Sequence, residues 1–409
     1  MGLMRAFCPN RIAVHLTRAS LRAVRRGHPW VYDRGIERQN RGGSAGDLAV
    51  LFDGNRRFVG VGLYDPESPI RVRVLHHGEQ TLIDAMWLRN RLADACRLRS
   101  ELREDAGTTA YRLVHGENDG LGGLVVDRYD RTLVIKLDTG AWVPHLAVLV
   151  DMVTELPGVE RVVLRLSRTV SDSATLPDGI FDGCILYGPA CDGPVVFLEN
   201  GLRFEADPVF GQKTGFFLDQ RDNRARLERV AGGREVLNVF SYTGGFSVYA
   251  ARGGARLVVS LDLSHPALLS ADRNMALNRS FPGVSSAMHE TVCADAFDGL
   301  SRMVSRGRRF GLVVLDPPSF ARRQSDVGRA VSAYERLVGL GLGVLRPGGI
   351  LVAASCSARV SADAFYGAVE RAAFQVGRQL AVMEKTAHAL DHPIGFAEGA
   401  YLKCLFARA

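Results

Sequence analysis

Lysine is scarce in this chain of 409 residues, and closely paired cysteines are missing from it. The sequence holds only four lysines, so arginine carries nearly all of its positive charge. The seven cysteines are scattered without a C-x-x-C pair, at Cys8, Cys96, Cys184, Cys191, Cys293, Cys356 and Cys404. This pattern argues against a disulfide framework and a zinc ribbon, and it favours a reducing cytoplasm and no bound metal.

Long apolar runs and two nucleotide-binding signatures are missing as well. No apolar stretch approaches the roughly 18–20 residues that a membrane span requires, and the N-terminus has no adequate signal-peptide core. We therefore expect no membrane partner and a cytoplasmic location. The chain has no G-x-x-x-x-G-K-[ST], so nucleoside triphosphate hydrolysis has no support, and no G-x-G-x-x-G, so a dinucleotide is poorly supported.

The net charge of +7 is concentrated at one end of the chain. Residues 1–75 contain 13 arginines against six acidic residues, so the whole excess lies there. A basic module indicates a polyanionic partner, because arginine binds phosphate through a forked guanidinium and stacks on bases. Its stretch "VRRGHPWVYDRGIER" (24–38) has the composition of a face that grips RNA. The alternative is a packed Trp30 and Tyr32 with solvated arginines.

The length allows two or three domains, since single cores rarely exceed roughly 250–300 residues. The first section, residues 1–76, has short strand-like runs typical of a small β-barrel or sheet, at 46–53, 57–65 and 70–75. The second section, residues 77–195, combines two helical patterns with strand-like runs, which predicts a small α+β domain. Within it, residues 171–194 are rich in Ser, Asp, Gly and Pro and predict a loop.

The third section, residues 196–409, alternates strands with helices. This predicts βαβ units, a mostly parallel sheet and an α/β fold, with the last residues forming an edge strand. Ligands bind beyond the carboxyl ends of such strands. Four features are expected there: the glycine loop "FSYTGGFS" (240–247), Asp262, Asp295, and the pair "LDPPSF" (315–320) with "ASCS" (354–357).

Several stretches together resemble one family. They are "KTGFFLDQRDNR" (213–224), "VLNVFSYTGGFSVYA" (236–250), "LDPPSF", "SCS" and "DHPIGFAEGAYLK" (391–403), with "RLVHGENDGLGGLVVDRY" (112–129) in the middle of the chain. The combination resembles the bacterial 23S rRNA (cytosine-C5)-methyltransferase I family over nearly the full length. The resemblance implies a PUA-like RNA-binding domain over 1–76, a central α+β domain over 77–195, and a class I (Rossmann-like) S-adenosylmethionine-dependent methyltransferase domain over 196–409.

The resemblance also implies site residues. The cofactor S-adenosylmethionine would be bound by Phe217, Asp219, Gln220, Arg221, Asn238, Ser241, Tyr242, Gly244, Asp262 and Asp295, with Asp262 on the ribose and Asp295 on the adenine amino group. Asp316 and Cys356 would face the target base, beside a rim formed by Pro317, Pro318, Ser319 and Phe320. From the basic stretch, we expect Arg25, Arg26 and Trp30 to contact RNA. The implied partner is 23S rRNA, and a homodimer stays open.

Cys356 stands where an apolar strand ends, which fits a nucleophile better than a core cysteine. A thiolate that adds to C6 of cytosine makes C5 enamine-like, and it leaves after C5 has lost its proton. Positive charge nearby, such as that of Arg359, would favour the thiolate. Asp316 would stabilise charge developing in the ring, and the target base must leave its stack.

One position departs from the pattern of many RNA cytosine-C5 enzymes, which carry a second cysteine where this chain has Ser319. The base that removes the C5 proton is therefore not identified. Two other classes stay open: a methyltransferase acting on a base nitrogen of RNA with Cys356 as a spectator, and a cofactor- and RNA-binding protein without turnover. Asp391 and His392 either form a turn or line the pocket.

Overall fold

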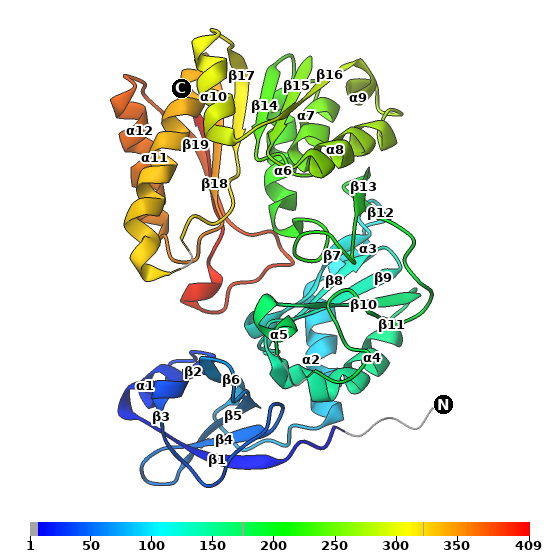
Figure 1. Ribbon diagram of the computed structural model, residues 1–409, viewed down its shortest axis with the longest axis vertical. Coiled ribbons are helices and arrows are strands. Elements are labelled where there is room, and N and C mark those ends of the chain that lie inside the picture. Colours follow the sequence, from blue (N-terminus) through cyan, green and yellow to red (C-terminus); the bar gives the residue numbers. More distant parts are fainter. Residues whose placement is uncertain (1–6, 174–175, 322) are drawn as a thin grey trace. The chain divides into compact units, whose positions relative to one another are not determined.

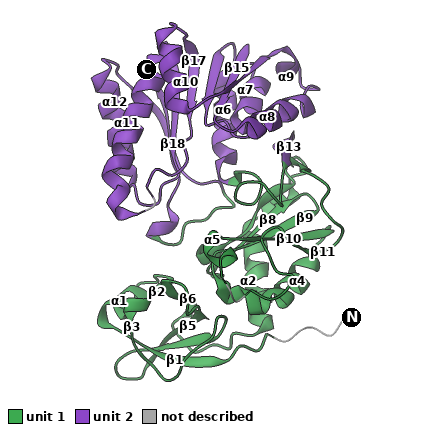
Figure 2. Cartoon of the chain, in the orientation of Figure 1, with its two compact units in different colours: residues 1–198, 206–218, 390–396 green, residues 199–205, 219–389, 397–409 purple. Residues whose placement is uncertain are grey.

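The computed structural model describes residues 7–173, 176–321 and 323–409. Its contacts divide the chain into two compact units, coloured separately in Figure 2. Unit 1 comprises residues 1–198, 206–218 and 390–396, and unit 2 comprises residues 199–205, 219–389 and 397–409. The three domain boundaries expected from the sequence stay a prediction.

The first part of unit 1 is a six-stranded sheet of order β2-β6-β5-β4-β1-β3 with one α-helix (Figure 1). All three strand-like runs of the sequence form strands, so that prediction is confirmed. The elements are β1 (Arg11–Leu16), α1 (Arg18–Arg25), β2 (Trp30–Tyr32), β3 (Ile36–Gln39), β4 (Leu48–Phe52), β5 (Phe58–Tyr64) and β6 (Ile70–His77). Alternate side chains such as Ile12, Val14 and Leu16 are buried, because successive residues of a strand point to opposite faces.

The second part of unit 1 is a five-stranded sheet of order β11-β10-β9-β8-β7. Its elements are α2 (Ala85–Leu98), α3 (Ser100–Glu104), β7 (Ala110–His115), β8 (Leu124–Tyr129), β9 (Thr132–Leu137), α4 (Leu146–Thr154), β10 (Arg161–Leu166), α5 (Arg168–Ser171) and β11 (Ile185–Tyr187). The prediction of loop throughout 171–194 is wrong at β11, which pairs antiparallel with β10. This strand has only three residues, none of them buried, so it leaves no hydrophobic alternation in the sequence.

A two-stranded hairpin, β12 (Val195–Glu199) and β13 (Leu202–Ala206), spans the boundary between the units. Unit 2 then forms a seven-stranded sheet of order β16-β15-β14-β17-β18-β20-β19. Its strands are β14 (Glu235–Val239), β15 (Leu257–Asp262), β16 (Met288–Cys293), β17 (Phe310–Leu315), β18 (Leu345–Ser355), β19 (Ala381–Thr386) and β20 (Lys403–Arg408). The first five pair with one another in parallel, which confirms the predicted α/β fold.

Helices cover both faces of this sheet (Figure 1). They are α6 (Arg221–Ala231), α7 (Gly245–Arg252), α8 (His265–Leu277), α9 (Pro282–Ser286), α10 (Ala296–Ser305), α11 (Val327–Gly343) and α12 (Ala362–Gln375). Alternate strand residues such as Leu237, Val259 and Leu351 share one buried cluster with side chains of α10, α11 and α12. Burial on both faces explains why these strands appear in the sequence as continuous apolar runs.

The prediction that the last residues form an edge strand is wrong. β20 lies between β18 and β19 and is antiparallel to both, so the edge strand is β19. Five of the six β19 residues are exposed, and its sequence AVMEKT has no alternation of apolar and polar residues that would mark it as a strand. In the described ranges, no helix is both long and apolar enough to cross a membrane.

Candidate functional site

Four chain segments meet beyond the carboxyl ends of adjacent parallel strands in unit 2. β15, β14, β17 and β18 are neighbours in this order. They lead into Asp262, the loop 240–244, the stretch 316–320 and Cys356, respectively. The sheet therefore brings the expected cofactor loop and the expected base-facing residues to one edge, where ligands bind in open α/β sheets.

The loop after β14 is held in an unusual backbone conformation. Phe240, Tyr242 and Gly244 have φ angles of 60°, 47° and 78°. Gly244 stands at the start of α7, and a Cβ there would lie 2.8 Å from the Cβ of Ala271. Glycine is therefore required at this position both for its backbone angle and for its close approach to α8.

Asp262 fastens this loop to the end of β15. Its Oδ2 accepts a 2.8 Å hydrogen bond from the backbone N–H of Tyr242, and its Oδ1 accepts a 2.9 Å bond from that of Ser264. The carboxylate is thus fixed at the strand end while it is only half-buried. A carboxylate can accept about four hydrogen bonds, so it retains capacity for hydroxyl groups of a ligand.

Three buried side-chain oxygens near this loop have no hydrogen-bond partner among the described residues: Asn238 Oδ1, Ser241 Oγ and Thr243 Oγ1. The Asn238 amide is fixed from its other side, because Nδ2 donates a 3.0 Å bond to Ser247 Oγ. An unsatisfied buried polar group costs about 1–3 kcal/mol, so such groups rarely cluster without a ligand. The residues present therefore fit a polar cofactor such as the one expected here.

Asp295, the residue expected to contact adenine, caps helix α10. Its Oδ1 accepts hydrogen bonds of 2.9 and 3.2 Å from the backbone N–H groups of Phe297 and Asp298. The side chain is exposed and lies just beyond β16, the neighbour of β15. Its adenine contact stays a prediction.

The segment 217–221 divides between the two units. Phe217 belongs to unit 1, where its ring centroid lies 4.4 Å from Lys213 Nζ. Asp219 and Arg221 are buried in unit 2, and Asp219 Oδ2 accepts a 2.8 Å bond from the Tyr401 hydroxyl. These contacts leave the cofactor roles of Phe217, Asp219 and Arg221 as predictions.

Gln220, expected at the cofactor, contacts Asp316, one of the two residues expected to face the target base. Its Nε2 donates a 2.9 Å bond to Asp316 Oδ1, and its Oε1 accepts a 2.6 Å bond from Asn223 Nδ2. The Thr386 hydroxyl in turn donates a 2.6 Å bond to Asn223 Oδ1. These three linked hydrogen bonds fix the orientation of the Asp316 carboxylate.

The sulfur of Cys356 lies against the Asp-Pro-Pro rim. Its thiol is 3.7 Å from the carbonyl oxygen of Pro317, and the residue is only half-buried. By contrast, Cys404 on β20 is fully buried, and burial raises the pKa of its thiol far above the ordinary value. The two cysteines therefore differ in access, and of this pair it is Cys356 that combines access with a place beside the Asp-Pro-Pro rim.

The remaining rim residues differ in exposure. Pro317 is buried, Phe320 is half-buried, and Pro318 and Ser319 are exposed. Ser319 Oγ lies 2.9 Å from Ser357 Oγ, which lies 3.2 Å from the Tyr334 hydroxyl. Burial raises the pKa of Tyr334, so this hydroxyl stays neutral.

Sequence reasoning missed Lys403, whose ammonium lies in the same part of unit 2. The side chain is buried on β20 and donates to the carbonyl oxygen of Ser357, directly after Cys356. Burial lowers the pKa of Lys403 to about 8, and the negative charge of the Cys356 thiolate acts against this shift. Arg359, the cation expected near the sulfur, is exposed. The available signal was a lysine inside the apolar run "YLKCLF" (401–406) of a chain with four lysines.

Asp391 and His392 are buried in unit 1. Asp391 Oδ2 accepts a 2.7 Å bond from the backbone N–H of Arg112, and its carbonyl oxygen accepts a 3.0 Å bond from Arg99. His392 Nδ1 lies 3.0 Å from Asp391 Oδ1. Of the two alternatives left open by the sequence, these contacts favour a structural turn that fastens the segment 390–396 to β7.

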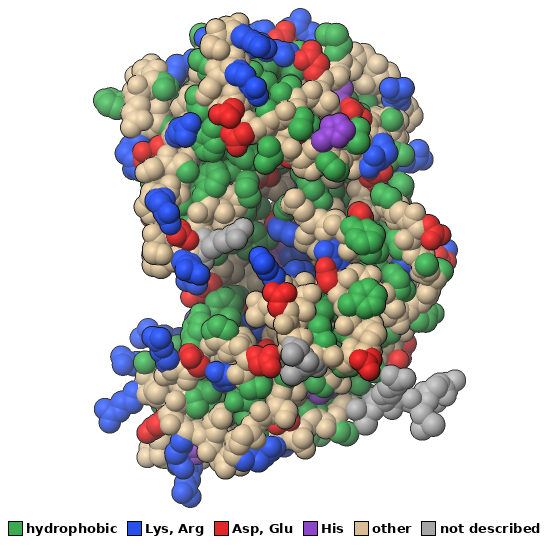
Figure 3. Space-filling view, viewed as in Figure 1, with side chains coloured by type: hydrophobic (Ala, Val, Ile, Leu, Met, Phe, Trp, Pro, Cys, Tyr) green, Lys and Arg blue, Asp and Glu red, His purple; other side chains and the backbone are tan. Residues whose placement is uncertain are grey.

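The first part of unit 1 carries an exposed basic face. Figure 3 shows Lys and Arg side chains gathered over the region of α1 and β3. Ten of its arginines are exposed: Arg11, Arg18, Arg22, Arg25, Arg26, Arg34, Arg38, Arg41, Arg56 and Arg57. Such a face attracts a polyanion.

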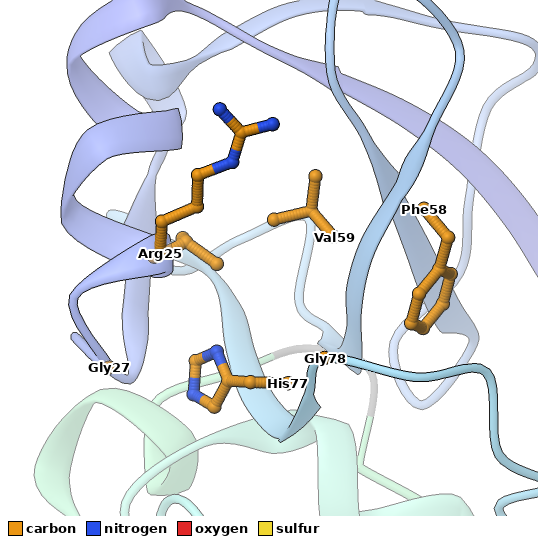
Figure 4. A pocket seen from close by; sticks show the side chains of 7 residues that line it. Arg25, Gly27, Phe58, Val59, His77 and Gly78 are labelled. Atoms are coloured by element: carbon orange, nitrogen blue, oxygen red, sulfur yellow. The ribbon is translucent and has the colours of Figure 1, made fainter.

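Arg25 also lines a hollow of about 370 Å³ in the same part of the unit (Figure 4). Phe58 and His77 line it as well, and burial lowers the pKa of His77. Arg25 itself is held by Asp53, with 3.0 Å between the two charged groups. The hollow therefore joins a positive charge, an aromatic ring and a neutral imidazole on the basic face.

Trp30 is packed within unit 1. Its Nε1 donates a 2.7 Å bond to Glu117 Oε1, and its ring meets that of Phe396 edge-on at 5.1 Å. Tyr32 beside it is exposed. The packed alternative from the sequence thus describes Trp30, and the RNA contacts of Trp30, Arg25 and Arg26 stay predictions.

Comparisons with known proteins agree with this architecture. A family model described as S-adenosylmethionine-dependent methyltransferase matches residues 187–402, and one described as a PUA-like domain matches residues 14–77. The ribosomal RNA large subunit methyltransferase of Deinococcus radiodurans is 48% identical over 400 residues, which cover 97% of each chain. The ribosomal RNA large subunit methyltransferase I of Shewanella denitrificans is 37% identical and covers 97% of this chain and 99% of that protein.

Among solved structures, that of SMU.776 complexed with SAH has the same fold. The TM-score is 0.83 at 22% identity, and the match covers 98% of this chain and 100% of the other. Fold and site thus define a class I methyltransferase domain preceded by a PUA-like domain. The chain belongs to the family of S-adenosylmethionine-dependent methyltransferases with these two domains, and S-adenosylmethionine is its cofactor.

Proposed function

We propose that this protein methylates C5 of a cytosine in the RNA of the large ribosomal subunit, 23S rRNA, through a transient bond between Cys356 and the base. The relatives' names support the RNA substrate. The observation that carries the C5 chemistry is the half-buried Cys356 thiol, 3.7 Å from the Pro317 carbonyl oxygen at the strand-end site. A nitrogen methyltransferase needs no thiol at this place.

The cofactor site is proposed at the loop after β14 and at Asp262. The unpaired oxygens of Asn238 and Ser241 accept hydrogen bonds from the cofactor, and Asp262 accepts those of the ribose hydroxyls. Gly244 lets the loop backbone approach the ligand, and Asp295 reaches the adenine amino group. When bound, S-adenosylmethionine supplies the electrophilic methyl group that C5 acquires.

The reaction proposed for the base begins at Cys356. The thiolate electron pair forms the bond to C6, and the C5–C6 electrons make C5 nucleophilic. Asp316, oriented by Gln220, hydrogen-bonds the polar edge of the base and stabilises charge that develops in the ring. After C5 has gained its methyl group, a base removes the C5 proton, the double bond re-forms and the thiolate leaves.

RNA reaches this site only with its target base unstacked. The exposed arginines of the first module, Arg25 and Arg26 among them, bind phosphates and hold the strand. Pro318 and Phe320 form the rim against which the flipped base lies.

Trapping on a 23S rRNA transcript that contains 5-fluorocytosine tests the proposal, because fluorine at C5 blocks the final proton removal. We expect a covalent protein–RNA adduct with the unmodified chain and with Cys8→Ala, a control at an exposed cysteine of unit 1. Cys356→Ala should form no adduct and transfer no methyl group while still binding S-adenosylhomocysteine. Methylated cytosine nitrogen without an adduct would establish the nitrogen reaction instead, and no transfer of labelled methyl to RNA would indicate a binding protein.

A further inference from the structure

The Lys403 ammonium closes the turn that follows Cys356. It donates hydrogen bonds to the carbonyl oxygens of Ser357 at 2.6 Å, Val360 at 2.7 Å and Tyr401 at 2.9 Å. An ammonium has three N–H donors, so all of them are used. Ser357 and Val360 bracket the turn, whose own bond from the Val360 N–H to the Ser357 oxygen measures 3.3 Å. The lysine thus ties the nucleophile's turn to β20.

A buried ammonium is costly, and Lys403 has no carboxylate partner to offset the cost in the part of the chain that the structure describes. Its side chain is 6% exposed, and no ion pair joins it to an acidic residue there. Removing such a charge from water costs several kcal/mol. A methionine or leucine would fill the same place on β20 without this cost, so a cation here requires a reason.

That reason lies in the adjacent sulfur. The negative charge that Cys356 acquires on ionisation raises the pKa of Lys403 and so partly offsets the effect of burial on it. Interaction free energies are reciprocal, so the same ammonium must stabilise the thiolate of Cys356. Position 319 is a serine in this chain, so no second thiolate at that position competes for the positive charge of Lys403.

We propose that Lys403 is a positioning residue for Cys356, which fixes the turn carrying the sulfur and holds one buried positive charge beside it, so that the thiolate form is favoured. This role rests on the proposed function of Cys356 as the nucleophile. The thiol proton passes to solvent, while the ammonium keeps its three protons. Lys403 is therefore distinct from the base that removes the C5 proton.

Other groups around the sulfur act in different directions. Asp316, after β17, carries a negative charge that opposes ionisation, and Tyr334 of α11 is a buried neutral hydroxyl. Arg359, on the turn itself, is exposed and therefore screened by water. Among these groups Lys403 is the one that is both positive and buried.

The pH dependence of Cys356 alkylation tests the charge directly. Iodoacetamide labelling, read by mass spectrometry of the Cys356 peptide, reports the thiolate fraction at each pH without RNA. In Lys403→Met the inflection should move upward by about one pH unit, since a nearby positive charge favours the ionised form of a thiol. Lys403→Arg keeps the charge and should restore most of the shift. An inflection unchanged in Lys403→Met would overturn the proposal.

A second measurement titrates Lys403 itself in proteins that retain this lysine. With only four lysines, ¹³C labelling of their side chains gives few NMR signals, and Lys403 is assigned by its loss in Lys403→Arg. Titration should show a lower Lys403 pKa in Cys356→Ala than in the unmodified chain. Equal Lys403 pKa values in the two proteins would show that the groups do not interact.

The two proposals fail separately. A shifted inflection without an adduct on 5-fluorocytosine RNA would keep the role of Lys403 toward the sulfur and reject the C5 reaction. An adduct combined with an unchanged inflection would keep the C5 reaction and reject the role of Lys403. In Lys403→Met we expect kcat to fall at neutral pH and to recover toward higher pH, with the affinity for S-adenosylhomocysteine unchanged.

Discussion

Gln220 Nε2 donates a 2.9 Å hydrogen bond to Asp316 Oδ1, although the two residues lie 96 positions apart in the chain. Gln220 precedes α6 and Asp316 follows β17, so the bond joins the segment at the start of the methyltransferase unit to the rim of its site. Asn223 holds the Gln220 amide from the other side at 2.6 Å. The orientation of the Asp316 carboxylate therefore depends on residues that need not touch RNA.

Gln220→Leu removes this donor at nearly constant side-chain volume. We expect kcat for methyl transfer to fall about 10- to 100-fold, since a small misplacement of a reacting group costs up to about that factor. The affinity for S-adenosylhomocysteine, measured by calorimetry, should change less than the rate. Asn223→Ala keeps the Gln220 donor but removes the hydrogen bond that orients its amide, so the loss in rate for this variant should be smaller. A loss confined to cofactor affinity would assign Gln220 to the cofactor alone.

The sequence predicts that the site lies at the carboxyl ends of the strands, but it does not predict the contacts within the site. Strand periodicity and the βαβ pattern place Asp262, Asp316 and Cys356 at the carboxyl ends of strands, and in the structure these are β15, β17 and β18 of one sheet. These positions follow from local signals because each residue ends its own strand or directly follows it. The same local signals describe the glycine loop before Gly244.

Contacts across distant segments leave no such local signal. The bond from Gln220 to Asp316 depends on how helix and sheet pack, and the bond from Lys403 to Ser357 depends on β20 lying beside β18. The sequence predicted an edge position for β20, with a partner strand on one side only. It did not predict that β20 lies between β18 and β19. The exposed strand β19, which forms that edge instead, has no alternation of apolar and polar residues that would indicate a further strand.

Gly244→Ala should destabilise the methyltransferase unit. The φ angle of 78° costs an alanine about 1–2 kcal/mol, and its Cβ would lie 2.8 Å from the Cβ of Ala271. We expect the free energy of unfolding in urea to fall by about 1–3 kcal/mol, with weaker binding of S-adenosylhomocysteine. Gly328→Ala is the matched control, since a Cβ at Gly328 on α11 meets nothing within 4 Å. Equal stability of the two variants would contradict the close packing of the loop on α8.

Arg22, Arg25 and Arg26 provide a test of the basic face. Their joint replacement by alanine should weaken RNA binding and reduce the slope of log K against log salt by about two, since each phosphate contact on single strands contributes about 0.7. Filter binding of a 23S rRNA transcript at several salt concentrations measures this slope. An equal number of exposed arginines in unit 2 provides a control with an unchanged slope: Arg302, Arg306 and Arg309. A slope unchanged in the first variant would remove α1 from the RNA interface.

The buried ammonium of Lys403 also makes stability depend on pH. Its pKa is about 8 in the folded chain and 10.5 ordinarily, so between these values the unfolded chain binds more protons. The free energy of unfolding therefore rises with pH in this window, whereas below pH 8 both states carry the charge. The free energy of unfolding of the unmodified chain, minus that of Lys403→Met, should rise by up to about 3 kcal/mol from pH 8 to 10.5. Urea unfolding at each pH measures it, and Lys385→Met, at an exposed lysine of β19, should show no such rise. A flat difference for Lys403→Met would mean that this ammonium keeps its ordinary pKa.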